Sequence, residues 1–192
     1  MTENIKRAEQ AKILRLFRKI HRLTGAALFI FFFVIAITGL LLGWKKHSGG
    51  ILLAKTENGT STYLKDWLPI DSLHSIACKV VRDSISADLS IEVDRIDIRK
   101  SKGIIKFVFS NHYWGVQLDG ATGKLLRVER RRADFIEKIH DGSILDQYLN
   151  TSNGQIKLIY TTVLGLALLV FTITGFWLWY GPKRMRKIAT SS

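Results

Sequence analysis

This sequence has almost no cysteine and none of the familiar catalytic motifs. Its 192 residues include one cysteine, Cys78, so an intramolecular disulfide and a cysteine-based metal cluster are both excluded. There is no H-E-x-x-H, no G-x-S-x-G and no phosphate-binding glycine loop. The apolar residues around Cys78 predict a small core residue rather than a nucleophile. The sequence therefore contains no catalytic constellation, and it leaves open whether the chain is an enzyme.

Acidic residues are also scarce, with 16 Asp and Glu against 29 Lys and Arg and a net charge of +13. This excess is concentrated at the two ends of the chain. Residues 1–23 contain seven basic and two acidic residues, and residues 182–192 contain four basic and none acidic. Short basic tails beside apolar segments are typical of the cytoplasmic side of a membrane protein. The charge therefore indicates a lipid bilayer as the partner and not a nucleic acid.

Two segments, residues 24–44 and 158–181, carry no charge. At about 1.5 Å per helical residue, each is long enough to cross a hydrocarbon core of about 30 Å. A cleaved signal peptide is the alternative for the first segment, but it would have a shorter apolar core and a small-residue cleavage site. The sequence predicts two transmembrane helices. It places both termini in the cytoplasm and residues 45–157 in the periplasm of a bacterial inner membrane.

Residues 45–132 predict a small α+β domain. A helix is expected after Asp71 or Ser72, which would cap it. Three strand-like segments follow, with a bulge at residues 94–95 and the alternating apolar residues Ile105, Phe107 and Phe109. Residues 119–123 predict a turn into one further strand. The expected fold is a helix packed on an antiparallel meander of about four strands.

The two apolar segments resemble each other near their ends. Thr38-Gly39 closes the first and Thr174-Gly175 the second. One interpretation is local, because threonine hydroxyls often bond back to their own helix. The other is a helix–helix contact, in which Gly39 and Gly43 form a G-xxx-G face that lets two backbones approach. That face would meet either the second helix of the same chain or a second copy.

Three motifs in order give the chain a family resemblance. They are YWGVQLDGATGKLL at residues 113–126, IHRLTG at residues 20–25, and IHDGS at residues 139–143 ahead of Thr174-Gly175. The chain resembles the PepSY-associated transmembrane helix family. This resemblance implies a PepSY-like domain at residues 45–132, followed by a membrane-proximal segment with His140 at residues 133–157. Independently of it, the charges and the helical spacing of the apolar residues at positions 1–23 predict a basic amphipathic segment. Some larger relatives look like siderophore-iron reductases that carry haem on helix-borne histidines, but they have four or more membrane helices.

Histidines near the membrane faces are the candidate ligands of haem b. Haem b takes axial ligands from opposite faces of its iron. His21 and His140 lie on opposite sides of the predicted bilayer, so they cannot hold the same iron. His47 and His140 share a side and could. Alternatively, His21 and His140 could each pair with its counterpart in a homodimer. The ordinary alternatives are an interfacial residue for His21 and a helix cap for His140.

Two functions are therefore expected. In the first, the chain is an inner-membrane PepSY-type protein that acts as a haem-binding electron-transfer or accessory subunit in iron or siderophore uptake. It would work as a homodimer or with a larger membrane partner. In the second, the chain is a non-enzymatic, membrane-anchored binding module. Its periplasmic domain would then dock a peptide, protease or transporter partner, for instance along a sheet edge.

Overall fold

The chain forms two compact units in a computed structural model that describes residues 2–190, with the side chains of residues 5, 8–151 and 153–186. The first unit joins Met1–Gly39 to Lys138–Ser192, and the second is Leu40–Glu137. Residue 1 of the predicted N-terminal segment and residues 191–192 of the predicted C-terminal tail lie outside the described residues.

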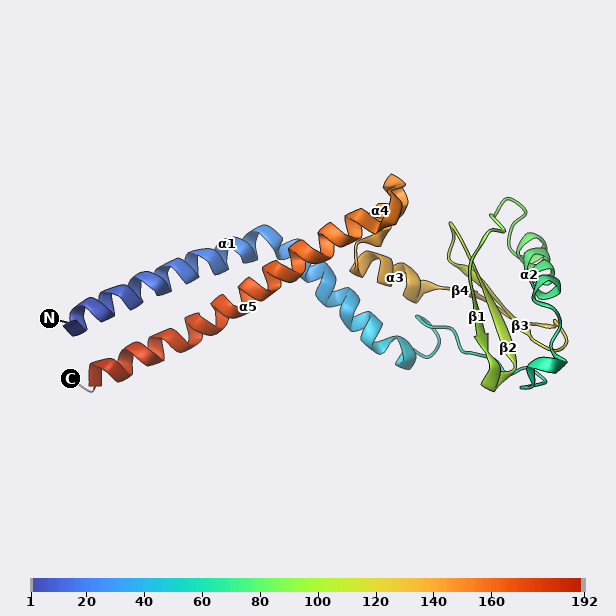
Figure 1. Cartoon of the computed structure of the whole chain (residues 1–192), viewed down its shortest axis with the longest axis horizontal. Helices are drawn as coiled ribbons and strands as arrows, with labels where there is room; N and C mark the ends of the chain where they lie inside the picture. The colour runs from blue at the N-terminus through green and yellow to red at the C-terminus, as the bar shows by residue number, and fades with distance from the viewer. Residues whose placement is uncertain (1, 191–192) are drawn as a thin grey trace. The chain divides into compact units, whose positions relative to one another are not determined.

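The first unit is built on two long helices, α1 (Thr2–Trp44) and α5 (Gln155–Thr190). They run antiparallel, with both chain termini at the same end of the pair (Figure 1). Phe17 stacks obliquely on Trp177 with ring centroids 6.0 Å apart. About one turn closer to the start of α1, a Cβ added at Gly181 of α5 would lie 2.5 Å from the Leu14 side chain. The basic N-terminal segment of α1 is thus continuous with the apolar segment and packs along α5.

Both long helices are apolar on their outer surfaces. The segments Ala8–His47 and Gln155–Arg186 are each long and apolar enough to cross a membrane, judged by length and composition. Only 6% of the most apolar window of each is buried within the chain. A core helix of a soluble protein would be mostly buried, because exposed apolar surface costs about 25 cal/mol per Å² in water. Lipid is the environment that such surfaces favour.

Two short helices, α3 (Arg132–His140) and α4 (Ser143–Leu149), precede α5. His140 is the last residue of α3, in line with the alternative that it lies at the end of a helix, whereas α4 is not predicted. From α4 the buried side chain of Asp146 caps α5. Its carboxylate accepts hydrogen bonds from the backbone N–H groups of Ile156 at 3.0 Å and Lys157 at 2.7 Å, and from the Thr151 hydroxyl. These donors include N–H groups that the first helical turn leaves without partners.

Acidification is expected to loosen the start of α5. The Thr151 hydroxyl, together with the two backbone N–H groups, holds the pKa of Asp146 below its ordinary 3.8. A carboxyl with a lowered pKa stabilises the fold above its unfolded pKa, and this stability is lost as pH falls through the folded value. Hydrogen exchange at the amides of Ile156 and Lys157, corrected for intrinsic rates, should therefore accelerate below about pH 4. Asp146→Asn should exchange faster even at neutral pH, and slow exchange in that variant would contradict the capping role.

The second unit is a four-stranded antiparallel sheet in the order β1-β2-β3-β4, with α2 on one face (Figure 1). Its elements are α2 (Ile70–Ser84), β1 (Val93–Arg99), β2 (Ile104–Phe109), β3 (Trp114–Asp119) and β4 (Leu125–Arg130). The predicted meander is confirmed, and so is the bulge, which shifts the β1–β2 register between Val93 and Arg95. The predicted cap is wrong, because the N-cap position of α2 is Pro69 and no side chain bonds there.

The core of the second unit lies between α2 and the sheet. Ile105, Phe107 and Phe109 of β2 point to this face, each at most 2% exposed, as their alternation predicts. From α2 they meet Leu73 and Val81, both fully buried. Cys78 belongs to the same cluster, where burial raises the pKa of its thiol and the charge of Arg82 lowers it less. The structure confirms Cys78 as a core residue.

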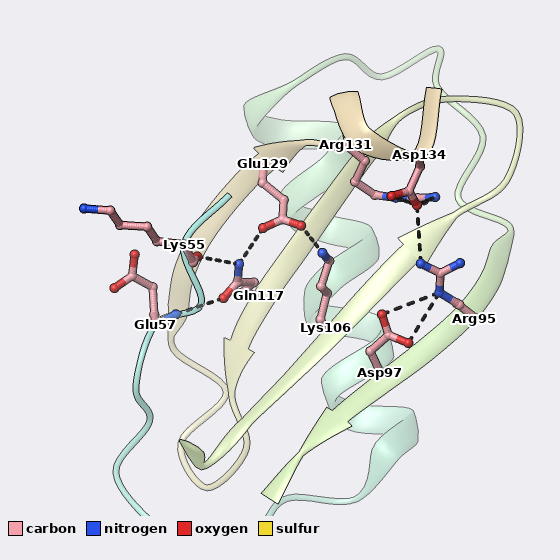
Figure 2. Close-up of polar contacts among 9 residues, drawn as sticks. All are labelled: Lys55, Glu57, Arg95, Asp97, Lys106, Gln117, Glu129, Arg131 and Asp134. Carbon is pink, nitrogen blue, oxygen red and sulfur yellow. Dashed lines mark hydrogen bonds and ion pairs between the residues drawn. The ribbon is translucent and has the colours of Figure 1, made fainter. Parts of the chain in front are cut away.

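The opposite face of the sheet holds a buried polar network, shown in Figure 2. Gln117, 1% exposed, donates to the Lys55 carbonyl at 3.1 Å and to Glu129, and it accepts from the Glu57 N–H at 3.2 Å. Glu129 also pairs with Lys106. Every buried charge in this group therefore has an opposite charge or a hydrogen-bond partner, which is what makes their burial tolerable.

Candidate functional site: two histidines held by the opposite helix

His21 of α1 is fixed against α5. Its Nδ1 lies 3.0 Å from Thr174 Oγ1 and 3.1 Å from the carbonyl oxygen of Phe171. Its ring stacks on that of Phe171, with centroids 3.9 Å apart and an interplanar angle of 22°. Gly175 makes the approach possible, because a Cβ there would lie 3.2 Å from His21 Cε1. The imidazole is therefore held in one orientation by three neighbouring residues of the other helix.

The hydrogen bonds of Thr174 determine which ring nitrogen of His21 carries the proton. The threonine hydroxyl has one proton to donate. Thr174 Oγ1 lies 2.7 Å from the carbonyl oxygen of Val170, one turn earlier in its own helix, so the hydroxyl donates its proton there. With that proton donated to the helix, Thr174 Oγ1 can only accept from His21. Nδ1–H is then the donor, and Nε2 keeps its lone pair. Thr174 therefore does both things that the sequence left open, bonding to its own helix and to another.

His140, the last residue of the short helix α3, is held in the same way against α1. Its Nδ1 lies 2.9 Å from Thr38 Oγ1, and the Thr38 Oγ1 lies 2.7 Å from the carbonyl oxygen of Val34. A Cβ added at Gly39 would lie 3.4 Å from His140 Cε1. The same reasoning leaves Nε2 of His140 with its lone pair. A Thr-Gly pair of α5 thus holds His21, and a Thr-Gly pair of α1 holds His140.

A groove runs from His140 along the apolar surfaces of α1 and α5. It has a volume of about 430 Å³ and is lined mainly by apolar side chains. The polar groups at its wall include His140, Asp141 and Tyr160. A Cβ added at Gly165 meets no atom of the described residues within 4 Å, so the groove is open there. The groove offers an apolar surface beside an imidazole nitrogen that has a free lone pair.

The loop after His140 is tightly built. Gly142 has φ of +77°, and a Cβ there would come within 2.7 Å of the Tyr160 ring, so only glycine fits. Asp141 accepts from the Ser143 N–H at 2.9 Å and pairs with Lys157. Burial raises the pKa of Asp141, but its bonds to Lys157 and Ser143 outweigh burial and leave the pKa below its ordinary value. Asp141 is therefore a carboxylate at the edge of the groove.

The two sites are far apart. Along α1, His21 and the His140 contact at Thr38 are separated by 17 residues, which is about 26 Å of helix. The two imidazoles cannot approach one metal ion at this separation. Among the described residues, no group of three or more His, Cys, Asp or Glu side chains could hold a metal ion. A metal ion or cofactor bound by either histidine would therefore need its other coordinating groups from outside this pair of helices.

The other predicted residues lie elsewhere. His47 is exposed in the short 3-10 helix η1 (Lys45–His47), which belongs to the second unit, so its role as a ligand stays a prediction. At Gly43 an added Cβ would meet no described atom within 4 Å, unlike at Gly39. His74 contacts the Cys78 sulfur at 3.2 Å, and His112 bonds to the Ser90 carbonyl at 2.9 Å. Both of these histidines have structural contacts in the second unit.

Sequence reasoning missed the residues that shape the two sites. Phe171 and Gly25 are one example, because a Cβ at Gly25 would lie 2.9 Å from the Phe171 ring that supports His21. Tyr160 beside Gly142 is the other. The glycines themselves were the available signal, since a glycine in an apolar helix, such as Gly25, can mark a close approach, and one in a loop, such as Gly142, can mark a positive φ.

No family model matches the chain, and neither does any curated protein or solved structure.

Proposed function

We propose that the chain is a two-span membrane protein whose His21 and His140 each bind a haem b, so that electrons pass between the two faces of the membrane. The PepSY resemblance suggests iron or siderophore uptake as the process served, and a periplasmic location for the second unit. Haem would supply one-electron chemistry at each end of the helix pair. The chain has no nicotinamide or flavin motif, so the electron donor would be a separate molecule.

One observation carries this proposal, the hydrogen-bonding of the two imidazoles. Histidines that bind a metal almost always donate their second ring N–H to a neighbouring oxygen, which fixes the tautomer and orients the ring. Here Thr38 and Thr174 accept from Nδ1 and leave both Nε2 atoms with lone pairs. If His21 were only an interfacial residue, there would be no reason for His140 to make the same hydrogen bond to a threonine at the other end of the helix pair.

The surroundings fit the same ligand. Haem b is a flat, mostly apolar group, and the groove beside His140 is apolar and open at Gly165. Near His21, the aromatic rings of Phe171 and Phe32 pack with centroids 5.8 Å apart. These residues would exclude water from the iron and hold the ring plane.

A second copy of the chain would complete each site. Each end of the helix pair provides one imidazole, whereas a bis-histidine haem requires two. A two-fold axis along the membrane normal would bring His21 next to its counterpart and His140 next to its own. His47 is the alternative second ligand for His140. A homodimer would also cover part of the exposed apolar surface of α1 and α5.

The decisive experiment is an absorption spectrum of the detergent-purified chain, oxidised and dithionite-reduced. We expect a Soret band and sharpened reduced bands, with about half of the haem lost in His21→Ala and about half in His140→Ala. Thr38→Val should shift or weaken the bands, because His140 loses its orienting acceptor. Thr172→Val is the matched control, since its exposed hydroxyl bonds only to the Leu168 carbonyl of its own helix. The absence of any Soret band after expression with added haem would overturn the proposal.

A binding module is the second candidate. Strand β1 lies at one edge of the sheet, paired only with β2, and its Ile96 and Ile98 are 38% and 48% exposed. An open edge with apolar side chains is where an extended peptide could add a strand. If the spectrum showed no haem, this edge would be the functional surface to test.

A further inference from the structure

We infer that the second unit carries a binding site for the phosphate headgroup of an anionic phospholipid, formed by Arg130, Arg132, Tyr113 and Phe135. A pocket of about 280 Å³ is lined by these four residues. Tyr113 immediately precedes β3, Arg130 ends β4, and Arg132 and Phe135 belong to the first turn of α3. The site uses none of the histidines.

Positive charge is in excess around this pocket. Residues 130–132 are three consecutive arginines. The Asp134 carboxylate is shared, since it binds Arg131 through Nε at 2.8 Å and Arg95 at 3.3 Å, as Figure 2 shows. Arg130 and Arg132 form no ion pair with any carboxylate of the described residues. Arg132 also donates from Nη1 to the Ile51 carbonyl at 3.3 Å, which is a neutral acceptor. The pocket therefore carries two guanidinium groups whose charge no carboxylate of the described residues neutralises.

One of these arginines has an unmet hydrogen bond. Arg131 is only 8% exposed, and its Nη1 is buried without a hydrogen-bond partner among the described residues. The backbone of Arg131 donates to the carbonyl of Tyr113 at 2.6 Å, which ties it to the pocket wall. Arg131 does not line the pocket and its guanidinium pairs with Asp134, so the positive charges that face the pocket are those of Arg130 and Arg132.

The rest of the pocket wall is aromatic. The rings of Tyr113 and Phe135 meet edge-on with centroids 5.3 Å apart, and Phe135 is 41% exposed. Arg130 lies over the Trp114 ring at 5.8 Å, which holds its guanidinium at the pocket rim. A ligand that combines a phosphate with an apolar substituent satisfies both parts of this wall. Guanidinium groups bind phosphate well because their donors match its oxygens.

The chain itself favours a lipid as the source of that phosphate. Phe135 is five residues from His140, which contacts Thr38 of α1, and five residues extend at most about 18 Å. The pocket is therefore only a few residues of chain away from a segment that contacts α1, so lipid headgroups are the nearest source of phosphate along the chain if α1 and α5 span a membrane. This inference rests on membrane insertion but not on haem.

Native mass spectrometry of the full-length protein in detergent tests this, with short-chain phosphatidylglycerol, phosphatidylcholine and inorganic phosphate as probes. We expect phosphatidylglycerol to bind at least about tenfold more tightly than phosphatidylcholine. Arg130→Gln with Arg132→Gln should abolish that preference. Lys100→Gln with Lys124→Gln is the control, because it removes the same charge from exposed positions of the same unit. Phe135→Ala should weaken phosphatidylglycerol binding without any change of charge.

Three results would overturn the inference. The first is an equal loss of preference in both double variants, which would show a general charge effect. The second is an unchanged preference in both the arginine variant and Phe135→Ala. The third is inorganic phosphate that competes as strongly as the lipid, which would assign the pocket to a soluble phosphate. Absorption spectra of the arginine variant should match those of the unaltered chain, so failure here is distinguishable from failure of haem binding.

Discussion

Gly175→Leu is expected to push His21 away from α5 and to separate the two long helices at that level. A Cβ alone at residue 175 would already lie 3.2 Å from His21 Cε1, and leucine adds three further carbons. Overpacking of this kind typically costs about 1 to 3 kcal/mol. That is roughly a 5- to 150-fold fall in the equilibrium constant for helix pairing.

A disulfide reports this pairing without any cofactor. Cysteines replacing Leu14 and Gly181, with Cys78 changed to alanine, should cross-link readily because the two positions are in contact. Gly175→Leu should slow the cross-link. Gly165→Leu makes the same change on the same helix where no described atom lies within 4 Å, and it should leave the rate unaltered. Equal cross-linking rates in the double-cysteine protein, its Gly175→Leu variant and its Gly165→Leu variant would show that the pairing of α1 and α5 does not depend on Gly175.

Gly59→Ala is expected to destabilise the second unit strongly. A Cβ at residue 59 would lie 2.1 Å from the backbone carbonyl oxygen of Gly103. Neither backbone can yield easily, because the Gly59 N–H donates to the Lys102 carbonyl at 2.7 Å and the Gly103 carbonyl accepts from Gly120 at 3.0 Å. The expected cost is about 3 kcal/mol or more. For a unit of this size that lowers Tm by about 12 °C or more.

Thermal unfolding followed by far-ultraviolet circular dichroism of the full chain measures this. The control is Gly43→Ala, which adds the same methyl group in α1 with no described atom within 4 Å. It should be neutral or stabilising by up to about 1 kcal/mol, because alanine favours helix over glycine. An unaltered melting profile for Gly59→Ala would mean that the contact between residues 59 and 103 is not maintained in solution.

Local patterns predict most of the elements of the fold, although not α4. The alternation of Ile105, Phe107 and Phe109 predicts that they share one face of a strand, and the structure buries all three in the core. The slip of phase at Asp94-Arg95 predicts the bulge that shifts the β1–β2 register. Uncharged segments of sufficient length predict both long helices. These features depend on near neighbours in the sequence, which is why they can be read from it.

Contacts between distant segments could not be predicted in the same way. The periodicity of the apolar residues shows which face of a helix is apolar, but it does not show which residues of another segment pack against that face. The pairing of His21 with Thr174, 153 residues away, has no local signature beyond the repeated Thr-Gly. Similarly, Lys106, Gln117 and Glu129 alternate with apolar residues and suggest a solvated face. Instead they form the buried network of Figure 2, because residues 55–57 supply partners from outside the sheet.

The long sequence separation between each histidine and its threonine has a consequence for biosynthesis. Thr174 is synthesised 153 residues after His21, which it holds. His140 needs Thr38 of α1, and its groove needs α5 as well. Neither site is complete before α5 has been made. A ligand that depends on the oriented imidazoles can therefore be loaded only after α5 has been synthesised and has paired with α1.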